Sequence, residues 1–435
     1  MLNMILRNSI NYKFNFNLFL FLLLCLVPVA LVWSRFIADF FVVLICIIFI
    51  IKSLIIKNNF FNNYFLKIFL LFWFLIVFRS LFSEDLYFSL KSSLPFIRFA
   101  IFALAVQYLV QENPKRIYVL FLILLPLLFT VASDGLYQYY KGENILGYPI
   151  SNFAGRLSGF FKDELIIGSY VARFTPILIG LYYYSKYLRF ISSKFDYFLF
   201  IVLLFFSYLV AHSGERVSFF YSIFTLVLFL LTFEEKFYKR FCLFLITILI
   251  FSLIITKNQQ ISQRYIKTTF EGYAPQNQIY HDSNGKIIKE KKFIFSIDHH
   301  FHIVAAYKIF KENILFGSGA KMFRKICDKR YKINAWSCTT HPHNLIMQFL
   351  SETGILGLLF YLLSLFYILL KLFKIFKLNI LDKINDFYRA QFFFLTSLLI
   401  SLFPIIPSGN FFNNWIGIIS FFPLGLYLAT VIKKN

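Results

Sequence analysis

The sequence predicts an all-α integral membrane protein with about twelve transmembrane helices and one large external loop that contains short helices. Of its 435 residues, 59% are hydrophobic and only 15% are charged, whereas soluble domains carry roughly 45–50% apolar and about 25% charged residues. The apolar residues also form continuous runs, such as FLFLLLCLVPVALVW over 19–33. These observations exclude a disordered chain, a secreted disulfide scaffold and an ordinary cytosolic enzyme.

The expected transmembrane helices follow from the apolar runs, because a helix needs about 20 mostly apolar residues to cross a bilayer. Prolines inside some of these runs are compatible with membrane helices. The predicted spans are 17–34, 36–56, 64–82, 93–111, 117–133, 165–184, 195–212, 217–233, 240–256, 355–373, 389–406 and 411–432.

The distribution of lysine and arginine predicts the orientation, since these residues are enriched in cytoplasmic loops. With the N-terminus in the cytoplasm, the alternate loops on that side hold 19 of the 44 lysine and arginine residues. The short external loops then hold only Arg35, Lys91 and Arg216. We therefore expect an even number of spans with both termini in the cytoplasm.

The formal net charge of +23 does not indicate a nucleic-acid partner, because the basic residues are scattered between apolar runs. Membrane lipids, or a phosphorylated lipid substrate, explain the charge better. The chain divides into three parts: 1–256, with nine spans and an external loop at about 134–164; 257–343, the large external loop; and 344–435, a re-entry segment with three spans.

The large loop has two recognisable segments. An amphipathic helix is expected over 301–314, where apolar residues recur on one face. The stretch 271–292 is polar and is interpreted as a lid or tether.

The most informative motif lies where this loop re-enters the membrane. It reads His343-Asn344, nine residues, Gly354, two residues, Gly357. This pattern resembles the signature of the O-antigen ligase family, and AAYKIFKENILFGSGAKMF (305–323) resembles the segment that precedes the signature. The same superfamily includes O-antigen polymerases and protein O-oligosaccharyltransferases.

The resemblance implies a GT-C-like, inverting and metal-independent glycosyltransferase of the bacterial inner membrane, without a cofactor. Its donor would be an undecaprenyl-diphosphate-linked glycan and its acceptor a sugar hydroxyl of lipid A–core, at the periplasmic face. A polymerase or a protein O-oligosaccharyltransferase is the alternative. A lipid-linked glycan transporter is less favoured, because the sequence has no visible inverted repeat.

The resemblance points to His343 as the catalytic residue, and imidazole can accept a proton near neutral pH. The structural alternative is that His343 only caps the following helix. Asn344 is predicted to bind substrate or to fix the local geometry, and His341 is a candidate partner of His343. Gly354 and Gly357 are expected to permit close packing or a tight turn.

Arg216 is predicted to contact the donor diphosphate as a second catalytic residue, because it lies in a very short external loop. The guanidinium group suits paired hydrogen bonds to phosphate. Pairing with Glu215 or contact with lipid headgroups is the alternative.

Further substrate-binding candidates are basic or histidine residues in the external segments. Arg156 and Arg173 resemble additional basic residues that the family keeps near the diphosphate, although Arg173 could instead pair with Asp163 or Glu164. In DHHFH (298–302), His299, or else His300 or His302, stands where many family members have an arginine.

Two remaining features concern metal and redox chemistry. DHHFH does not have standard zinc spacing, so no metal site is predicted. Cys327 and Cys338 lie together in the large loop. A disulfide between them is favoured over two free thiols if the loop is periplasmic.

Overall fold

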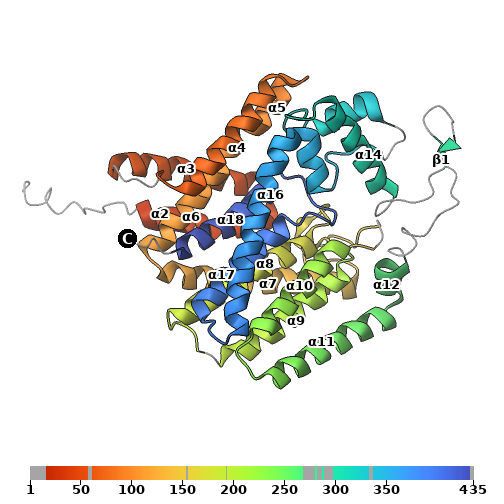
Figure 1. Ribbon diagram of the computed structural model, residues 1–435. Helices are drawn as coiled ribbons and strands as arrows, with labels where there is room; N and C mark the ends of the chain where they lie inside the picture. The colour runs from red at the N-terminus through yellow and green to blue at the C-terminus, as the bar shows by residue number, and fades with distance from the viewer. Residues whose placement is uncertain are drawn as a thin grey trace, which may run out of the picture.

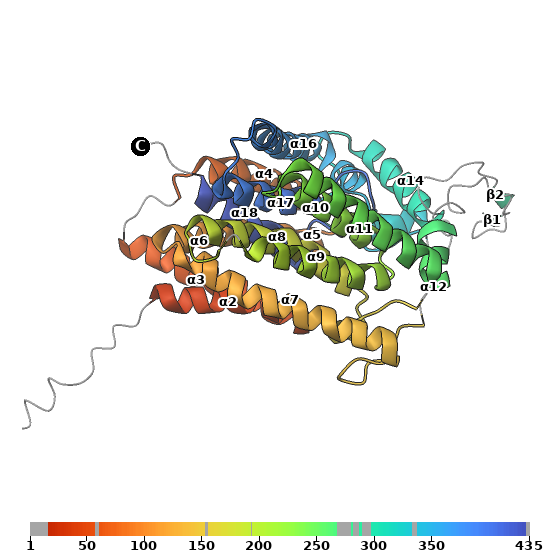
Figure 2. The same cartoon turned by 90° about the horizontal axis from the view of Figure 1, so that it is seen from below.

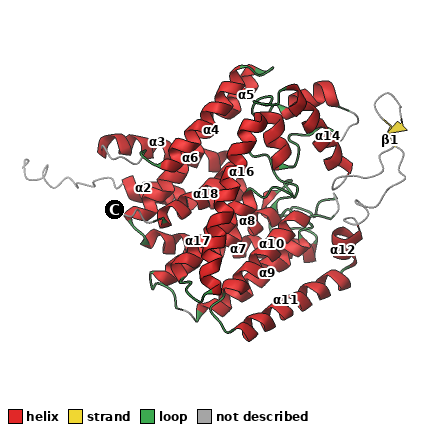
Figure 3. Cartoon of the chain, in the orientation of Figure 1, coloured by secondary structure: helices red, strands yellow, loops and turns green. Residues whose placement is uncertain are grey.

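The computed structural model describes most of the chain, and nearly all of it is helical (Figures 1 and 3). Its two strands, β1 (Tyr280–His281) and β2 (Ile287–Ile288), form a two-residue antiparallel pair. The predicted lid or tether lies almost entirely outside the described residues. The described residues are 16–56, 61–152, 155–192, 194–267, 280–281, 287–288, 297–332 and 337–431.

Each of the twelve predicted spans coincides with a helix, usually within a few residues at either end. Apolar side chains dominate all of these helices. The helices are α2 (Phe16–Trp33), α3 (Arg35–Ile56), α4 (Tyr64–Leu81), α6 (Ile97–Glu112), α7 (Lys115–Lys141), α8 (Ile167–Tyr187), α9 (Phe195–His212), α10 (Arg216–Thr232), α11 (Phe237–Lys257), α16 (Leu345–Ile380), α17 (Asp386–Ser401) and α18 (Asn414–Thr430).

The shorter helical elements occupy the segments between these helices. The amphipathic helix predicted over 301–314 corresponds to α14, which begins earlier, at Ile297. The short elements are α5 (Leu86–Ser93), η2 (Leu94–Phe96), η3 (Gly159–Phe161), α12 (Gln259–Ser262), η4 (Gln263–Lys267), α14 (Ile297–Glu312), α15 (Phe323–Ile326) and η5 (Cys327–Tyr331).

The chain is a multi-pass membrane protein. Within the described residues, eight helical stretches are long and apolar enough to cross a bilayer, and α10 and α18 are shorter apolar helices. The helices α8 and α17 fall in neither group. The count of twelve spans therefore remains a prediction.

The position of α8 explains why it is less uniformly apolar. It packs against α7, α9, α10 and α17, and almost all of its residues are buried. Figure 2 shows α8 in the middle of the bundle, between α7 and α10. A helix surrounded by protein can carry polar side chains that would be costly against lipid.

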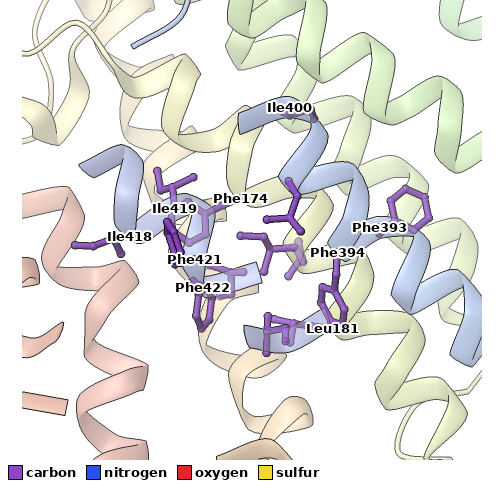
Figure 4. Close-up of a cluster of buried hydrophobic side chains, with 14 of the residues drawn as sticks. Phe174, Leu181, Phe393, Phe394, Ile400, Ile418, Ile419, Phe421 and Phe422 are labelled. Atoms are coloured by element: carbon purple, nitrogen blue, oxygen red, sulfur yellow. The ribbon is translucent and has the colours of Figure 1, made fainter. Parts of the chain in front are cut away.

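The core of the bundle is built from phenylalanine and aliphatic side chains of α8, α17 and α18 (Figure 4). Phe174 and Leu181 of α8 and Phe394 of α17 are fully or almost fully buried. A methyl group on Gly180 would lie 2.5 Å from the Phe394 ring, so glycine lets these two helices approach closely. By contrast, α11 lies at the edge of the bundle and buries few residues.

An ion-pair network closes the end of the bundle that is predicted to face the cytoplasm. The ammonium of Lys186 in α8 lies 2.9 Å from carboxylate oxygens of both Asp196 and Glu234. Arg389 of α17 lies 2.8 Å from Asp386 and 3.3 Å from Glu234. Buried cations are tolerated here because each one is paired.

Candidate functional site

Asn344 fixes the point at which α16 begins. Its side-chain oxygen accepts a hydrogen bond from the backbone N–H of Met347 at 3.1 Å, and its amide nitrogen donates to the carbonyl of Pro404 at 3.0 Å. The first bond is an N-cap, which satisfies a backbone N–H that has no partner within the helix. Asn344 therefore orients the residue before it, His343. Its predicted part in substrate binding stays a prediction.

His343 has a backbone conformation that non-glycine residues rarely adopt. Its φ is 54°, in the left-handed region, where a bulky side chain is unfavourable. Its carbonyl oxygen accepts a hydrogen bond from the backbone N–H of Ser408 at 2.8 Å. Holding a residue in such a region costs about 1–3 kcal/mol, and such residues concentrate at functional sites.

Four histidine rings gather around this position, and we call them the histidine cluster: His299, His302, His341 and His343. The His343 ring centroid lies 4.0 Å from that of His341, 5.3 Å from that of His302 and 5.4 Å from that of His299. His299 and His302 lie three residues apart in α14, which puts them on one face of the helix. Two segments of the large loop therefore meet at His343.

The imidazoles of His299, His341 and His343 are neutral at pH 7, because burial lowers the pKa of each. Burial lowers the pKa of His343 far below its ordinary value, and the neighbouring His341, His299 and His302 lower it further. Burial, His302 and the positive charge of Arg216 lower the pKa of His299 to about 4. A neutral imidazole keeps one nitrogen that can accept a hydrogen bond or a proton.

Arg216 lies near enough to the histidine cluster for its positive charge to lower the pKa of His299. Arg216 is the first residue of α10 and is partly buried. Burial lowers the pKa of Arg264, and the charges of Arg156 and Arg216 lower it further, so these three guanidiniums lie close together. We call Arg156, Arg216 and Arg264 the arginine cluster.

The loop that joins α9 to α10 holds the arginine cluster in place. Arg264 donates a hydrogen bond from Nε to the carbonyl of Gly214. Gly214 has a φ of +74°, and a methyl group there would lie 3.1 Å from Arg264 Nε and 3.2 Å from Arg156 Cγ. Glycine therefore allows both arginines to pack against the loop backbone.

Glu215 is buried beside the arginine cluster and stabilises the start of α8. Its carboxylate accepts backbone hydrogen bonds from Gly168 at 2.8 Å and from Ser169 at 3.1 Å. Its ion pair among the described residues is with Arg156, at 3.9 Å, and not with its neighbour Arg216. The interpretation of Arg216 as a partner of Glu215 therefore lacks support.

A cavity of about 420 Å³ lies beside the start of α8. Four cationic side chains line it, those of Arg35, Arg173, Lys321 and Arg324, against one carboxylate among the described lining residues, that of Glu164, and His341 lines it as well. Its lining includes neither His343 nor Arg216, so it reaches the histidine cluster through His341. We call it the cationic cavity. Its size and charge suit a phosphate-bearing ligand.

Arg173 is held in this cavity by neutral partners. It donates from Nε to the hydroxyl of Ser169 at 3.1 Å and from a terminal nitrogen to the carbonyl of Ile400 at 3.3 Å. Its guanidinium also lies over the Tyr221 ring, 5.1 Å from the centroid. Glu164, which the sequence offered as a partner for Arg173, pairs with Arg35 instead. Among the described carboxylates, none forms an ion pair with Arg173.

Gly354 breaks α16 at the point where the backbone of 314–319 packs against this helix. Its φ of 64° and ψ of −164° interrupt the helix. The backbone of 314–319 fills the break: Ser318 donates to the carbonyl of Ser351 and Ile355 donates to that of Ile314, both at 2.9 Å. The backbone groups freed by the break thus find partners in the inserted loop.

The same part of the chain resembles a known protein family. Residues 200–362 match the family model described as O-antigen ligase. This stretch, a little over a third of the chain, is therefore similar to an O-antigen ligase domain. A search of curated proteins gave no match.

The O-antigen ligase domain contains most of the site. It spans α9 to the first turns of α16, and so includes the histidine cluster, Arg216 and Arg264. Arg156 and Arg173 lie outside it. The match supports a glycosyltransferase-like activity of the ligase or polymerase type, with a lipid-linked glycan and a lipid acceptor as substrates in general terms.

Several charged residues of the site were not expected from the sequence. Lys321 and Arg324 lie near the end of the segment that precedes the signature, and Arg264 lies near the start of the large loop, but nothing in their local pattern sets them apart from other loop cations. The left-handed φ of 59° at Lys321 is a structural signal only. Burial and the charge of Arg324 lower the pKa of Lys321.

Cys327 and Cys338 form a disulfide, with Cα atoms 5.7 Å apart. It joins η5 to the segment that leads directly to His341 and His343. The crosslink therefore restrains the segment that approaches the histidine cluster.

In the part of the chain that the structure describes, no group of three or more histidine, cysteine or acidic side chains is arranged to hold a metal ion.

Proposed function

We propose that the protein is an O-antigen ligase of the bacterial inner membrane. It would transfer a glycan from undecaprenyl diphosphate to a sugar hydroxyl of lipid A–core at the periplasmic face. The observation that carries this proposal is the gathering of histidine rings at His343, with the charge of Arg216 near enough to lower the pKa of His299, inside a stretch that matches an O-antigen ligase domain. The three-part division of the chain at 256 and 343 is part of the same proposal.

The arginine cluster is the proposed site for the donor diphosphate. Arg156, Arg216 and Arg264 bring three positive charges together beside the buried carboxylate of Glu215. As the glycosidic bond to the diphosphate breaks, negative charge develops on the leaving oxygen. Positioned guanidiniums stabilise that charge.

His343 is proposed to orient and deprotonate the acceptor hydroxyl. The acceptor oxygen forms a bond to the anomeric carbon while the bond between that carbon and the diphosphate oxygen breaks. The electron pair of the broken bond leaves with undecaprenyl diphosphate, and the hydroxyl proton passes to the imidazole of His343. One displacement of this kind inverts the anomeric centre.

We expect an unusual pH dependence, because His343 must be neutral to act. Its depressed pKa keeps it neutral below pH 6.5 in the free protein, so kcat/KM for the donor should stay flat as the pH falls from 8 to 6. Bound diphosphate raises the pKa by its negative charge, so kcat should begin to fall at a higher pH than kcat/KM does. A fall of both parameters together near pH 6.5 would contradict this assignment.

The lipopolysaccharide of a deletion strain tests the proposed function. A ligase mutant should show no capped core and should accumulate lipid-linked polymer, and the wild-type gene should restore the ladder. Core that carries a single repeat unit would indicate a polymerase. A normal ladder with loss of a glycosylated protein would indicate a protein O-oligosaccharyltransferase.

A further inference from the structure

A second cavity, of about 670 Å³, opens beside the arginine cluster at the ends of α7, α9 and α11. We call it the tyrosine–amide cavity. Its lining contains three tyrosines, one histidine and four amide side chains, and Lys257 is its only lysine, arginine or carboxylate. Among the residues that line it are Tyr139, Tyr140, Tyr208, His212, Gln259 and Gln260.

The side chains of this cavity suit a neutral sugar. Tyrosine rings offer flat faces to the C–H side of a pyranose ring, and each amide offers both donors and an acceptor for sugar hydroxyls. A phosphate would meet few cations here, and a lipid chain would meet too many polar groups. The volume lies within the range of ordinary ligand pockets.

Hydrogen bonds and ring contacts hold the wall of the cavity together. The hydroxyls of Tyr140 and Tyr208 lie 2.6 Å apart, and Asn258 donates to the hydroxyl of Tyr139 at 2.7 Å. The ring of His212 lies 4.3 Å from that of Tyr208. The aromatic surface is therefore built before any ligand arrives, which reduces the entropy cost of binding.

The tyrosine–amide cavity shares its walls with the arginine cluster. Gln263, at its edge, directly precedes Arg264. A methyl group on Gly155, the neighbour of Arg156, would lie 2.0 Å from the side-chain nitrogen of Gln260. A glycan whose diphosphate is held by the arginine cluster would therefore find this cavity next to it.

We propose that the tyrosine–amide cavity binds sugar residues of the lipid-linked glycan donor, beyond the sugar attached to the diphosphate. This inference rests on the proposed function, because it takes the arginine cluster as the diphosphate site. Residues at the end of α7 and in α12 would then determine how well the protein distinguishes long donor glycans from short ones. The sugar at the anomeric bond stays near His343.

The test compares Tyr140→Ala and Gln259→Ala with Tyr137→Ala as the matched control. Tyr140 and Tyr137 lie in the same helix, and both are exposed, but only Tyr140 lines the cavity. The full-length protein in proteoliposomes is assayed with two donors, undecaprenyl diphosphate carrying the polymer or a single sugar. We expect Tyr140→Ala to raise KM for the polymer donor about five- to tenfold, at unchanged kcat, with less than a twofold change for the single-sugar donor.

A second measurement does not depend on catalysis. Free glycan, released by mild acid from the lipid-linked pool of a deletion strain, is the probe for saturation-transfer NMR with the detergent-solubilised protein. We expect signal with the wild type and Tyr137→Ala, and at least a severalfold loss with Tyr140→Ala. Equal signals for all three proteins would overturn the inference, as would a KM effect on the acceptor instead of the donor.

The two proposals fail in distinguishable ways. If the wild type does not transfer glycan but binds the free glycan through Tyr140, the sugar site stands and the proposed function fails. If the wild type transfers glycan but Tyr140→Ala matches Tyr137→Ala with both donors, the sugar site is wrong and the ligase assignment is untouched.

Discussion

Replacing His343 with alanine is expected to abolish glycan transfer, with kcat reduced about 10²- to 10⁴-fold. The variant removes the imidazole that would orient the acceptor hydroxyl and take its proton. KM for the lipid-linked donor should change little, because the arginine cluster remains intact. Acceptor-dependent release of undecaprenyl diphosphate from proteoliposomes measures both parameters.

His343→Asn is the companion variant that protects this prediction against misfolding. Asparagine tolerates the left-handed backbone that His343 adopts, so the thermal midpoint of this variant should stay within a few degrees of the wild type. It cannot accept a proton in the way imidazole does. We expect the same loss of kcat as with alanine, and near-normal turnover by a stably folded His343→Asn protein would remove His343 from the mechanism.

Replacing Gly354 with alanine is expected to destabilise the protein by about 3 kcal/mol or more. A methyl group there would lie 2.3 Å from the carbonyl oxygen of Leu315, which belongs to the backbone and cannot move alone. The φ of 64° and ψ of −164° also fall in a region that essentially only glycine adopts, at a cost of about 1–3 kcal/mol. The thermal midpoint of the purified protein measures the effect.

Gly147→Ala is the matched control for this prediction. Gly147 also has a positive φ, of 81°, but a methyl group on it would meet no atom within 4 Å. The Gly147→Ala variant therefore has backbone strain without a steric clash. It should lower the thermal midpoint much less than Gly354→Ala does. If both variants melt alike, the contact between 314–319 and the break in α16 does not contribute to stability.

Much of the helical architecture could be predicted from the sequence, because apolar runs report a local property. Every predicted span coincides with a helix, and the disulfide joins the two cysteines that the sequence paired. The prediction was less informative for α8, where burial against protein on all sides replaces contact with lipid. To determine how many helices cross the bilayer, one must know what surrounds each helix as well as its sequence.

The candidate site was only partly predictable, because its members come from distant parts of the chain. The motif identified His343, and the spacing of His299 and His302 is compatible with one helical face. That this face meets His343 is a tertiary contact. Likewise, Arg156 joins Arg216 while Arg173 joins the cationic cavity, although the two residues are close in sequence.

The most direct test of the account is the release of undecaprenyl diphosphate by the purified wild-type protein in proteoliposomes, with and without lipid A–core. We expect release to require the acceptor and to match, mole for mole, the glycan that becomes attached to it. Release that is equally fast without lipid A–core, or movement of intact donor across the bilayer with no release, would contradict the proposed transfer.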